Sequence, residues 1–519
     1  MSTPPSTHHG LIRSAGTIGI FTALSRVLGF IRDIIIAAAF GTGLGAEAFV
    51  VSFRIPNLLR DLVGEGATNA AFVPALTECR EKTPDRFWRL SATLFWVMSG
   101  ILLILSVLGV LFAEPIVALI APGFLHSSDP EKFPLTVKLT RVIFPYIFLI
   151  GLSALAMGIL NSLKEFKSSA FGPALLNLCL ITAGVWFEKD YGPMALVVGV
   201  LVGGVFQLAC QVPPLMRRGF RFFPAGGERE YTGKIGRLLL PRVFGSALYQ
   251  INVFVDSILA SFESFVGVGG QSALYYANRL FQLPLAIFGL ALAQALLPTF
   301  STQMVRNDYE GFRDTFVSSI CSLLFIITPA SFGLIVLSRP IIRVLFEHGR
   351  FDGYSTSITS SALFFYAFGL LSCCLIKVLV NAFYAMQDTR TPVRTMLISV
   401  AFNVALSLLL MGPLKIGGLA LASTLSATLN AFLLYSRLRR CSGPFDEPRM
   451  LSAFVKILLA AGVMALTVMA YNFFVLERFQ SGSRILQGFV MGGGIVMAIV
   501  VYFTAALLLR VEEARKIFS

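Results

Sequence analysis

Residues 14–40, SAGTIGIFTALSRVLGFIRDIIIAAAF, combine the length of a membrane-spanning helix with three charged side chains, Arg26, Arg32 and Asp33. If the helix enters the bilayer at Ser14, Arg26 lies roughly 18 Å along it, near the middle of a hydrocarbon core about 30 Å thick. A cation at that depth costs roughly 2.5 to 3.5 kcal/mol, so it usually faces a water-filled cavity or a partner. The stretch therefore predicts a membrane helix beside a polar path.

Similar apolar stretches recur along the whole chain, whose 519 residues are 56% hydrophobic and 13% charged with a mean hydropathy of +0.77. This composition is typical of an all-α polytopic membrane protein. We expect prolines inside the stretches, such as Pro145 and Pro284, to bend their helices. The sequence predicts fourteen spans, approximately 14–40, 47–76, 91–113, 134–160, 170–187, 193–215, 236–262, 271–301, 313–337, 354–385, 392–411, 417–436, 451–474 and 485–509.

The distribution of lysine and arginine predicts the topology. With the N-terminus inside, alternate loops hold about three times as many basic residues as the loops between them, as expected for the cytoplasmic side. We therefore expect both termini in the cytoplasm. The net charge of +14 lies mostly in these loops and needs no nucleic-acid partner, because topology and anionic lipid headgroups account for it.

The chain carries no recognisable signature of a catalytic or metal site. Its four histidines have no metal-ligand spacing, none of its seven cysteines lies in a predicted external loop, and GxSxG, Walker A and HExxH patterns are missing from the sequence. These features predict neither an ATP-driven pump nor a hydrolase, and they favour a transporter without a cofactor or a disulfide framework.

A weak internal repeat appears at an offset near 224 residues. The interval Glu47–Pro74 aligns with Gln271–Pro298, and later matches keep the same order. Because both halves begin in the cytoplasm, the repeat is parallel. The predicted parts are a cytoplasmic N-terminus 1–13, an N-lobe 14–215, a basic linker 216–235, a C-lobe 236–436, a cytoplasmic loop 437–450, two appended helices 451–509 and a cytoplasmic tail 510–519.

Polar side chains within the predicted spans suggest a cationic cavity. In the first span Arg26 and Asp33 fall within about 20° of one face, with Arg32 roughly 120° away. Cations outnumber acids among these positions, and arginine binds phosphate through a planar fork, so we expect an anionic substrate such as a phosphate or diphosphate. Interhelical ion pairs and snorkelling to the interface are the alternatives. Further candidates are Glu47, Arg54, Arg60, Asn278, Arg279, Gln282 and Lys377.

Two other features of the spans have competing interpretations. Asp256, with Asn403 as a candidate neighbour, would suit a bound cation, but pairing with an arginine or the backbone explains it equally well. Gly199 and Gly203 form a GxxxG pattern, which predicts close helix packing rather than a binding site.

Several motifs, taken in order, resemble the bacterial lipid II flippase family MurJ over nearly the whole chain. The matching stretches are SRVLGFIRD (25–33), PNLLR (56–60), EGA (65–67), AFVP (71–74), FPY (144–146), YYANR (275–279), GRF (349–351) and FYAMQDTRTP (383–392).

The resemblance implies a fourteen-helix fold of the multidrug/oligosaccharidyl-lipid/polysaccharide exporter type in the bacterial inner membrane. It implies transport of lipid II, the undecaprenyl-diphosphate-linked peptidoglycan precursor, to the outer leaflet by alternating access, with residues 451–509 as the groove for its tail. Cell-wall synthesis enzymes are candidate partners, and we expect a monomer. The positions that match family cavity residues are Arg26, Arg32, Arg60 and Arg279, with Ser25 and Glu47 near them.

The chain departs from some relatives at two positions. Gln282 stands where some have a glutamate, and Ser407, one turn after Asn403, stands where sodium-coupled members have an acid. Coupling to Na⁺, to H⁺ or to the membrane potential all agree with the sequence. A flippase for another polyprenyl-linked glycan, a cation-coupled multidrug exporter and a non-transporting scaffold for cell-wall enzymes are the alternative functions.

Overall fold

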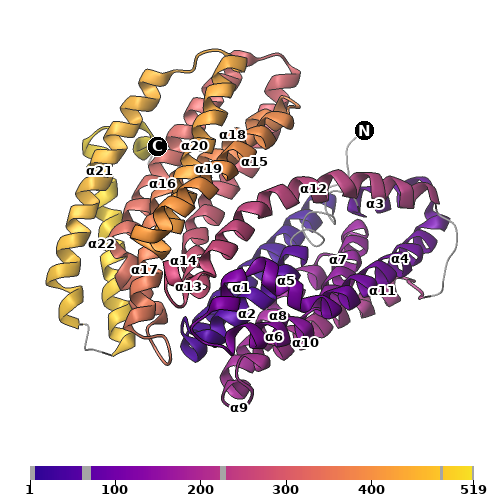
Figure 1. Cartoon of the computed structure of the whole chain (residues 1–519). Helices are drawn as coiled ribbons and strands as arrows, with labels where there is room; N and C mark the ends of the chain where they lie inside the picture. The colour runs from indigo at the N-terminus through magenta and orange to yellow at the C-terminus, as the bar shows by residue number, and fades with distance from the viewer. Residues whose placement is uncertain (1–5, 61–71, 223–228, 480–482, 517–519) are drawn as a thin grey trace. The chain divides into compact units, whose positions relative to one another are not determined.

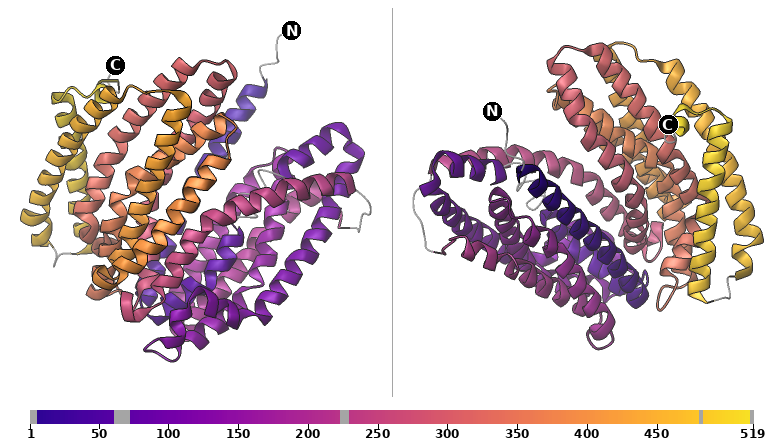
Figure 2. Two further views of the ribbon diagram at one scale, coloured as in Figure 1. Left: turned by 45° about the horizontal axis from the view of Figure 1, so that its top comes forward. Right: turned by 180° about the vertical axis from the view of Figure 1, so that it is seen from behind.

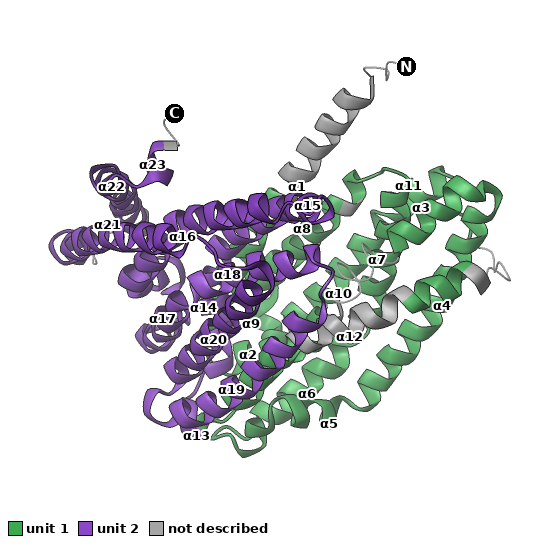
Figure 3. Cartoon of the chain, turned by 90° about the horizontal axis from the view of Figure 1, so that it is seen from above, with its two compact units in different colours: residues 1–263 green, residues 264–519 purple. Residues whose placement is uncertain are grey.

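The computed structural model describes residues 6–60, 72–222, 229–479 and 483–516. All regular structure in these ranges is helical, which confirms the all-α prediction. The chain divides into two compact units, residues 1–263 and 264–519 (Figure 3). Both units contain buried apolar side chains, so each has a core of its own.

The number of membrane-spanning helices can be counted among the described residues only. Ten helices are long and apolar enough to cross a membrane, and the pair α17 (Gly353–Phe368) and α18 (Leu370–Ala385), bent by 45°, makes eleven. All eleven overlap predicted spans. The predicted spans 14–40, 47–76 and 236–262 include positions outside the described residues or side chains. The chain is thus a multi-span membrane protein, and the count of fourteen is not confirmed.

Unit 1 holds the N-terminal helices (Figure 1). Their bounds are α1 (Ser6–Phe40), α2 (Leu44–Arg60), α3 (Val73–Lys82), α4 (Pro84–Leu111), α5 (Ala113–Ile120), η2 (Pro122–His126), α6 (Lys132–Ile143), α7 (Tyr146–Ser162), α8 (Lys167–Thr182), η3 (Ala183–Phe187), α9 (Glu188–Tyr191), α10 (Pro193–Ala209), α11 (Val212–Arg217) and α12 (Arg229–Ala260). The short helix α13 (Glu263–Val266) begins at the last residue of the unit.

Proline and glycine shape this unit. Pro145 stands in the break between α6 and α7, because proline cannot donate the backbone hydrogen bond that would continue the helix. Helix α8 packs against both α1 and α10. On α10, a Cβ atom added at Gly199 would lie 2.8 Å from Cβ of Ala183, and one at Gly203 would lie 2.8 Å from the Leu176 side chain. This confirms that the GxxxG pattern marks close packing.

Unit 2 holds the remaining helices. Their bounds are α14 (Gly270–Pro284), the π-helical turn η4 (Leu285–Leu290), α15 (Ala291–Val305), α16 (Tyr309–Phe346), α17, α18, α19 (Arg390–Leu414), α20 (Ile416–Ser442), α21 (Glu447–Phe474), η5 (Leu476–Phe479), α22 (Arg484–Leu508) and α23 (Glu512–Lys516). Pro284 stands where regular α14 gives way to the wider turn η4.

The two C-terminal membrane helices, α21 and α22, lie side by side at the edge of unit 2 (Figures 1 and 2). Both also pack on α16, and the Tyr502 hydroxyl donates a 2.7 Å hydrogen bond to the carbonyl of Phe325. These helices correspond to the predicted appended pair at 451–509.

Helix α12 packs with unit 1, against α3, α4, α5 and η2. The repeat in the sequence assigns most of this helix to the C-lobe and its first turns to the linker. A repeat and a packing unit need not share a boundary, so the predicted domain bounds stay a prediction.

Candidate functional site: charged residues of the membrane helices

Arg32 and Asp33 of α1 form a buried ion pair. The guanidinium donates Nε and Nη2 to Oδ1 of Asp33 at 3.0 and 2.7 Å, and Nη1 to Oδ1 of Asn177 in α8 at 2.9 Å. The amide of Asn177 in turn donates to the carbonyl of Ser25 at 3.0 Å. The arginine therefore joins α1 to α8, and one acid compensates its charge within the apolar region.

Arg26 has a different environment from Arg32. Its side chain is exposed, and no ion pair or hydrogen bond joins it to another side chain in the part of the chain that the structure describes. The side chain of Ser25 beside it is half-buried. Arg26 and Asp33 share a face but form no pair, because seven residues place them about 10 Å apart along the helix. Asp33 pairs with its sequence neighbour Arg32 instead.

Glu47 of α2 lies in a second buried cluster, with Lys132 of α6 and Glu263 of α13. The Lys132 ammonium makes ion pairs with both carboxylates and lies 4.4 Å from the centre of the Phe124 ring. Lys132 and Glu47 are each 1% exposed. One cation between two acids connects the beginning of α2, the beginning of α6 and the end of unit 1.

Glu263 has further partners that hold it at this end of the unit. It accepts hydrogen bonds from the Ser127 hydroxyl at 3.0 Å and from the Ser128 amide at 3.1 Å. Burial of the Glu263 carboxyl alone would raise its pKa, but the bonds and charge of Lys132, with help from the serines, shift the pKa below its usual value. Glu263 is therefore ionised at neutral pH.

Of the two candidate cations of α2, the structure describes the side chain of Arg54 but not that of Arg60. Arg54 is half-buried and donates a 3.1 Å hydrogen bond from Nη1 to the carbonyl of Val253 in α12. Arg60 is the last residue of α2, and its side chain lies outside the described residues.

In unit 2, Arg279 of α14 is held against an aromatic ring. Its Nη2 donates to the hydroxyl of Tyr275, one turn earlier, at 3.2 Å, and its guanidinium carbon lies 4.9 Å from the centre of that ring. Asn278 is half-buried and Gln282 is exposed. The ring contact restricts the orientation of the guanidinium and supplies a cation–π interaction.

The remaining candidates lie on three different helices. Lys377 is half-buried on α18 of unit 2. Asn403 is buried on α19, and its Oδ1 accepts a 3.4 Å hydrogen bond from the hydroxyl of Ser407. Asp256 is half-buried on α12 of unit 1. Among the described residues, no three histidine, cysteine or acidic side chains gather as metal ligands.

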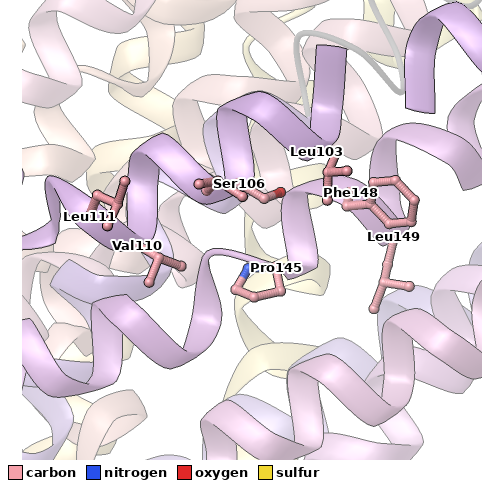
Figure 4. Close-up of a pocket in the computed structure, with 8 residues that line it drawn as sticks. Leu103, Ser106, Val110, Leu111, Pro145, Phe148 and Leu149 are labelled. Carbon is pink, nitrogen blue, oxygen red and sulfur yellow. The ribbon is translucent and has the colours of Figure 1, made fainter. Parts of the chain in front are cut away.

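An apolar pocket of about 380 Å³ lies between α4 and the break that separates α6 from α7 (Figure 4). Leu103, Val110, Phe148 and other apolar side chains line it, together with Ser106. With no charged group in its wall, this pocket does not suit a phosphate, and it is separate from the arginines described above.

Sequence reasoning missed three residues of these clusters. Asn177 was detectable as the polar side chain within the apolar span 170–187. Lys132 and Glu263 carried no such signal, because each lies in a short polar segment that resembles an ordinary loop. Only the contact between segments that are distant in sequence shows that Lys132 is buried and Glu263 half-buried.

Comparison with known proteins extends over almost the entire chain. The family model described as "Lipid II flippase MurJ" matches residues 36–490. "Probable lipid II flippase MurJ" of Vibrio cholerae is 36% identical over 97% of both chains. The protein of the same name from Haemophilus influenzae is 34% identical over 95% of this chain and 98% of the relative. "Lipid II flippase MurJ" of Burkholderia cenocepacia is 36% identical over 88% of this chain and 89% of the relative.

Solved structures agree with this result. "Lipid II flippase MurJ, inward closed conformation" matches with a TM-score of 0.79 and 26% identity, covering 97% of this chain and 99% of the other. An inward-facing multidrug transporter of the MATE family matches with a TM-score of 0.68 at 15% identity, over 80% of this chain and 94% of the other, and this likeness concerns the fold alone. The family model and the curated relatives together confirm the resemblance seen in the motifs, and the chain belongs to the MurJ family of lipid II flippases.

Proposed function

We propose that the chain carries lipid II, the undecaprenyl-diphosphate-linked peptidoglycan precursor, from the inner to the outer leaflet of the bacterial inner membrane. The observation that carries the proposal is family membership over nearly the whole length, at 34–36% identity to proteins named for this activity. This activity moves a lipid and breaks no covalent bond, so we infer that the protein is a transporter and not an enzyme.

The environments of the cations divide them into two groups. Arg32 and Lys132 are buried against carboxylates, so they stabilise the bundle and have little charge left to offer an anion. Arg26 is exposed at about mid-membrane depth and has no acid paired with it among the described residues. We assign roles in diphosphate recognition to Arg26 and to Arg279, each taken by itself, because a planar guanidinium group matches phosphate oxygens.

Transport in the proposal proceeds by alternating access. Charge neutralisation by the arginines offsets the dehydration of the diphosphate in one state, and release follows when these contacts separate in the other. The polyprenyl tail stays in the bilayer beside α21 and α22. Both termini lie in the cytoplasm, as the distribution of basic residues predicts. The chain works as a monomer, with cell-wall synthesis enzymes as candidate partners.

The energy source is a separate part of the proposal. The Asp256 carboxylate or the Asn403 amide would supply an oxygen ligand for a coupling Na⁺, whereas H⁺ or the membrane potential would drive transport without either residue. Lipid II translocation in vesicles with an imposed Na⁺ gradient, pH gradient or potential discriminates these three. The Asp256→Asn variant should lose only a sodium-dependent component.

The test of the function is a leaflet-accessibility assay for lipid II in cells depleted of the protein and complemented with variants. Arg26→Ala and Arg279→Ala should abolish translocation while the protein still accumulates in the membrane. Arg437→Ala, which removes an exposed arginine of α20 outside the family motifs, is the matched control and should transport normally. Wild-type translocation by both cavity variants would refute the assignment of these arginines.

Headgroup specificity is tested separately in reconstituted vesicles. Unlabelled lipid II should compete with a labelled lipid II probe, whereas another polyprenyl-diphosphate glycan or a cationic drug should not. Competition by the other glycan alone would replace the proposed substrate, and competition by the drug would favour a multidrug exporter.

A further inference from the structure

The chain turns back on itself directly after α11, at Gly219. The amide of Phe220 donates to the carbonyl of Leu215 at 3.1 Å, and that of Gly219 donates to Met216 at 3.0 Å, which is the Schellman pattern at a helix C-terminus. Gly219 has a φ of +103°, which is unfavourable for any residue with a side chain. The turn directs residues 220–222 along α4.

Aromatic rings hold this segment against α4. Phe220 is buried, with its ring centre 6.1 Å from that of Trp88, and Phe222 lies 5.2 Å from Phe95. The indole of Trp96 donates a 3.2 Å hydrogen bond to the carbonyl of Phe222. Trp96 and Phe222 nevertheless remain 48% and 39% exposed, so the cluster presents an indole and a phenyl ring at the surface of unit 1.

Three exposed arginines border these rings. Arg89 follows Trp88 on α4, Arg217 ends α11 two residues before Gly219, and Arg221 precedes Phe222. A Cβ atom at Gly219 would lie 3.4 Å from the Trp88 indole nitrogen, so the end of α11 lies beside Trp88, which precedes Arg89 in α4. In the described residues, no ion pair or side-chain hydrogen bond involves these three guanidinium groups.

Other charges nearby are already compensated. Glu165 pairs with Arg218 at 2.9 Å, and Arg218 also donates to the carbonyl of Leu163. Glu81 pairs with Arg80 at 2.8 Å. Asp85, exposed in the first turn of α4, is the acid closest in sequence to Arg89, where it also interacts favourably with the helix dipole. Among the described residues, three arginines against one acid leave an excess of positive charge on this surface.

We propose that Arg89, Arg217, Arg221, Trp96 and Phe222 form a headgroup surface that binds an anionic phospholipid of the surrounding membrane. Tryptophan is enriched at the membrane–water interface, and arginine gives phosphate two parallel hydrogen bonds. A soluble phosphate would use the arginines but not the exposed indole and phenyl rings, so the rings favour a lipid. The surface lies outside the groups assigned to the transported diphosphate and does not depend on the proposed function.

Tryptophan fluorescence provides the test, because two of the chain's three tryptophans, Trp88 and Trp96, lie in this cluster. The full chain carrying Trp186→Phe is reconstituted into phosphatidylcholine vesicles that contain brominated phosphatidylglycerol or, in the second arm, brominated phosphatidylcholine. Bromine quenches an indole that it contacts. We expect phosphatidylglycerol to quench at a roughly tenfold lower mole fraction than phosphatidylcholine.

The triple variant R89Q/R217Q/R221Q should lose this preference, because the attraction between the three arginines and an anionic headgroup is what produces it. The triple variant R390Q/R437Q/R440Q removes the same charge from exposed arginines of unit 2 and should keep it. Circular dichroism checks that both variants are folded. The variant R89K/R217K/R221K should retain part of the preference, because lysine keeps the positive charge but lacks the planar fork of arginine.

Equal quenching by the two lipids in the wild-type background would overturn the proposal. So would an unchanged preference in a folded R89Q/R217Q/R221Q variant, or an equal loss in the unit 2 control. If 50 mM inorganic phosphate removes the preference for phosphatidylglycerol while sodium chloride of the same ionic strength does not, the surface binds soluble phosphate instead.

Discussion

Arg32 and Asp33, adjacent in the chain, form an ion pair through a single carboxylate oxygen: Oδ1 of Asp33 accepts hydrogen bonds from both Nε and Nη2 of Arg32, at 3.0 and 2.7 Å. Their side chains are 8% and 3% exposed. The positive charge of Arg32, which would be costly in the membrane, is thereby compensated within its own helix, and its third nitrogen, Nη1, donates to Asn177 of α8.

Asp33→Asn should destabilise the protein by about 3–5 kcal/mol, because it leaves the buried Arg32 charge without its acid. Thermal unfolding in detergent measures the change. The double variant Arg32→Met/Asp33→Leu removes both charges and should recover most of the loss. A double variant no more stable than Asp33→Asn would show that the pair is not what stabilises this region.

Arg26 and Arg32 should separate transport from stability. Arg26→Ala is expected to abolish lipid II translocation with little change in unfolding temperature, since the side chain is exposed. Arg32→Ala should lower both, because it removes the arginine that compensates the buried Asp33 carboxylate. Translocation and unfolding measured on the same preparations check this contrast. Equal destabilisation by the two variants would contradict it.

Lys132→Met should cost about 3–5 kcal/mol at pH 7.5, because two carboxylates then lie together without their cation. In the wild type, Lys132 lowers the pKa of Glu263, so this contribution is present above the unfolded pKa near 4.5 and is lost as the pH falls. Without Lys132, burial raises the pKa of Glu263. The variant should therefore regain stability between pH 7.5 and pH 5, whereas the wild type should not. Unfolding temperatures at the two pH values test this, and a parallel response would refute it.

Glu78 of α3 links that helix to Lys234 of α12. Hydrogen bonds from Lys234 and then Lys82 lower the pKa of Glu78 to about 2. This link is therefore present above the usual pKa of 4.5 and is lost as the pH falls toward 2. Hydrogen exchange of residues 229–237, corrected for intrinsic rates, should accelerate over that range. Glu78→Gln should show the faster exchange already at pH 7, and unchanged exchange would contradict the link.

Gly199→Ala should destabilise unit 1 by about 1–3 kcal/mol, because its Cβ would lie 2.8 Å from Cβ of Ala183 and the helices α8 and α10 would have to separate. Gly462→Ala is the control: a Cβ there meets nothing within 4 Å, and alanine favours the helix. Thermal unfolding should shift downward only for the first variant. Similar shifts of the unfolding temperature in both variants would mean that the close approach at Gly199 does not determine the stability of unit 1.

Much of the fold follows from the sequence, because a membrane helix can be recognised from the composition of its own segment. An apolar stretch of about 20 residues is recognisable without knowledge of its neighbours. Eleven predicted spans overlap membrane-length helices, and the GxxxG pattern of α10 marks a close contact as expected. The motifs from SRVLGFIRD onward indicated the family that the comparisons confirm.

The pairing of the charged residues could not be predicted from the sequence in the same way. Helical periodicity placed Arg26 and Asp33 on one face, but periodicity describes a helix alone and cannot say which neighbour covers that face. The partner of Arg32 is Asn177 of α8, 145 residues away, and the partner of Glu47 in α2 is Lys132 of α6, 85 residues away.

The sequence by itself determined that this is a helical membrane protein with cations inside its spans, because the cost of exposing a backbone or a charge to lipid acts on each segment separately. Only the tertiary structure decided which cations are neutralised. Lys132 lies in a polar segment at the beginning of α6, and it is buried solely because α2 and α13 bring Glu47 and Glu263 to it. Electrostatic energy depends on distance in space, and that distance is set by packing.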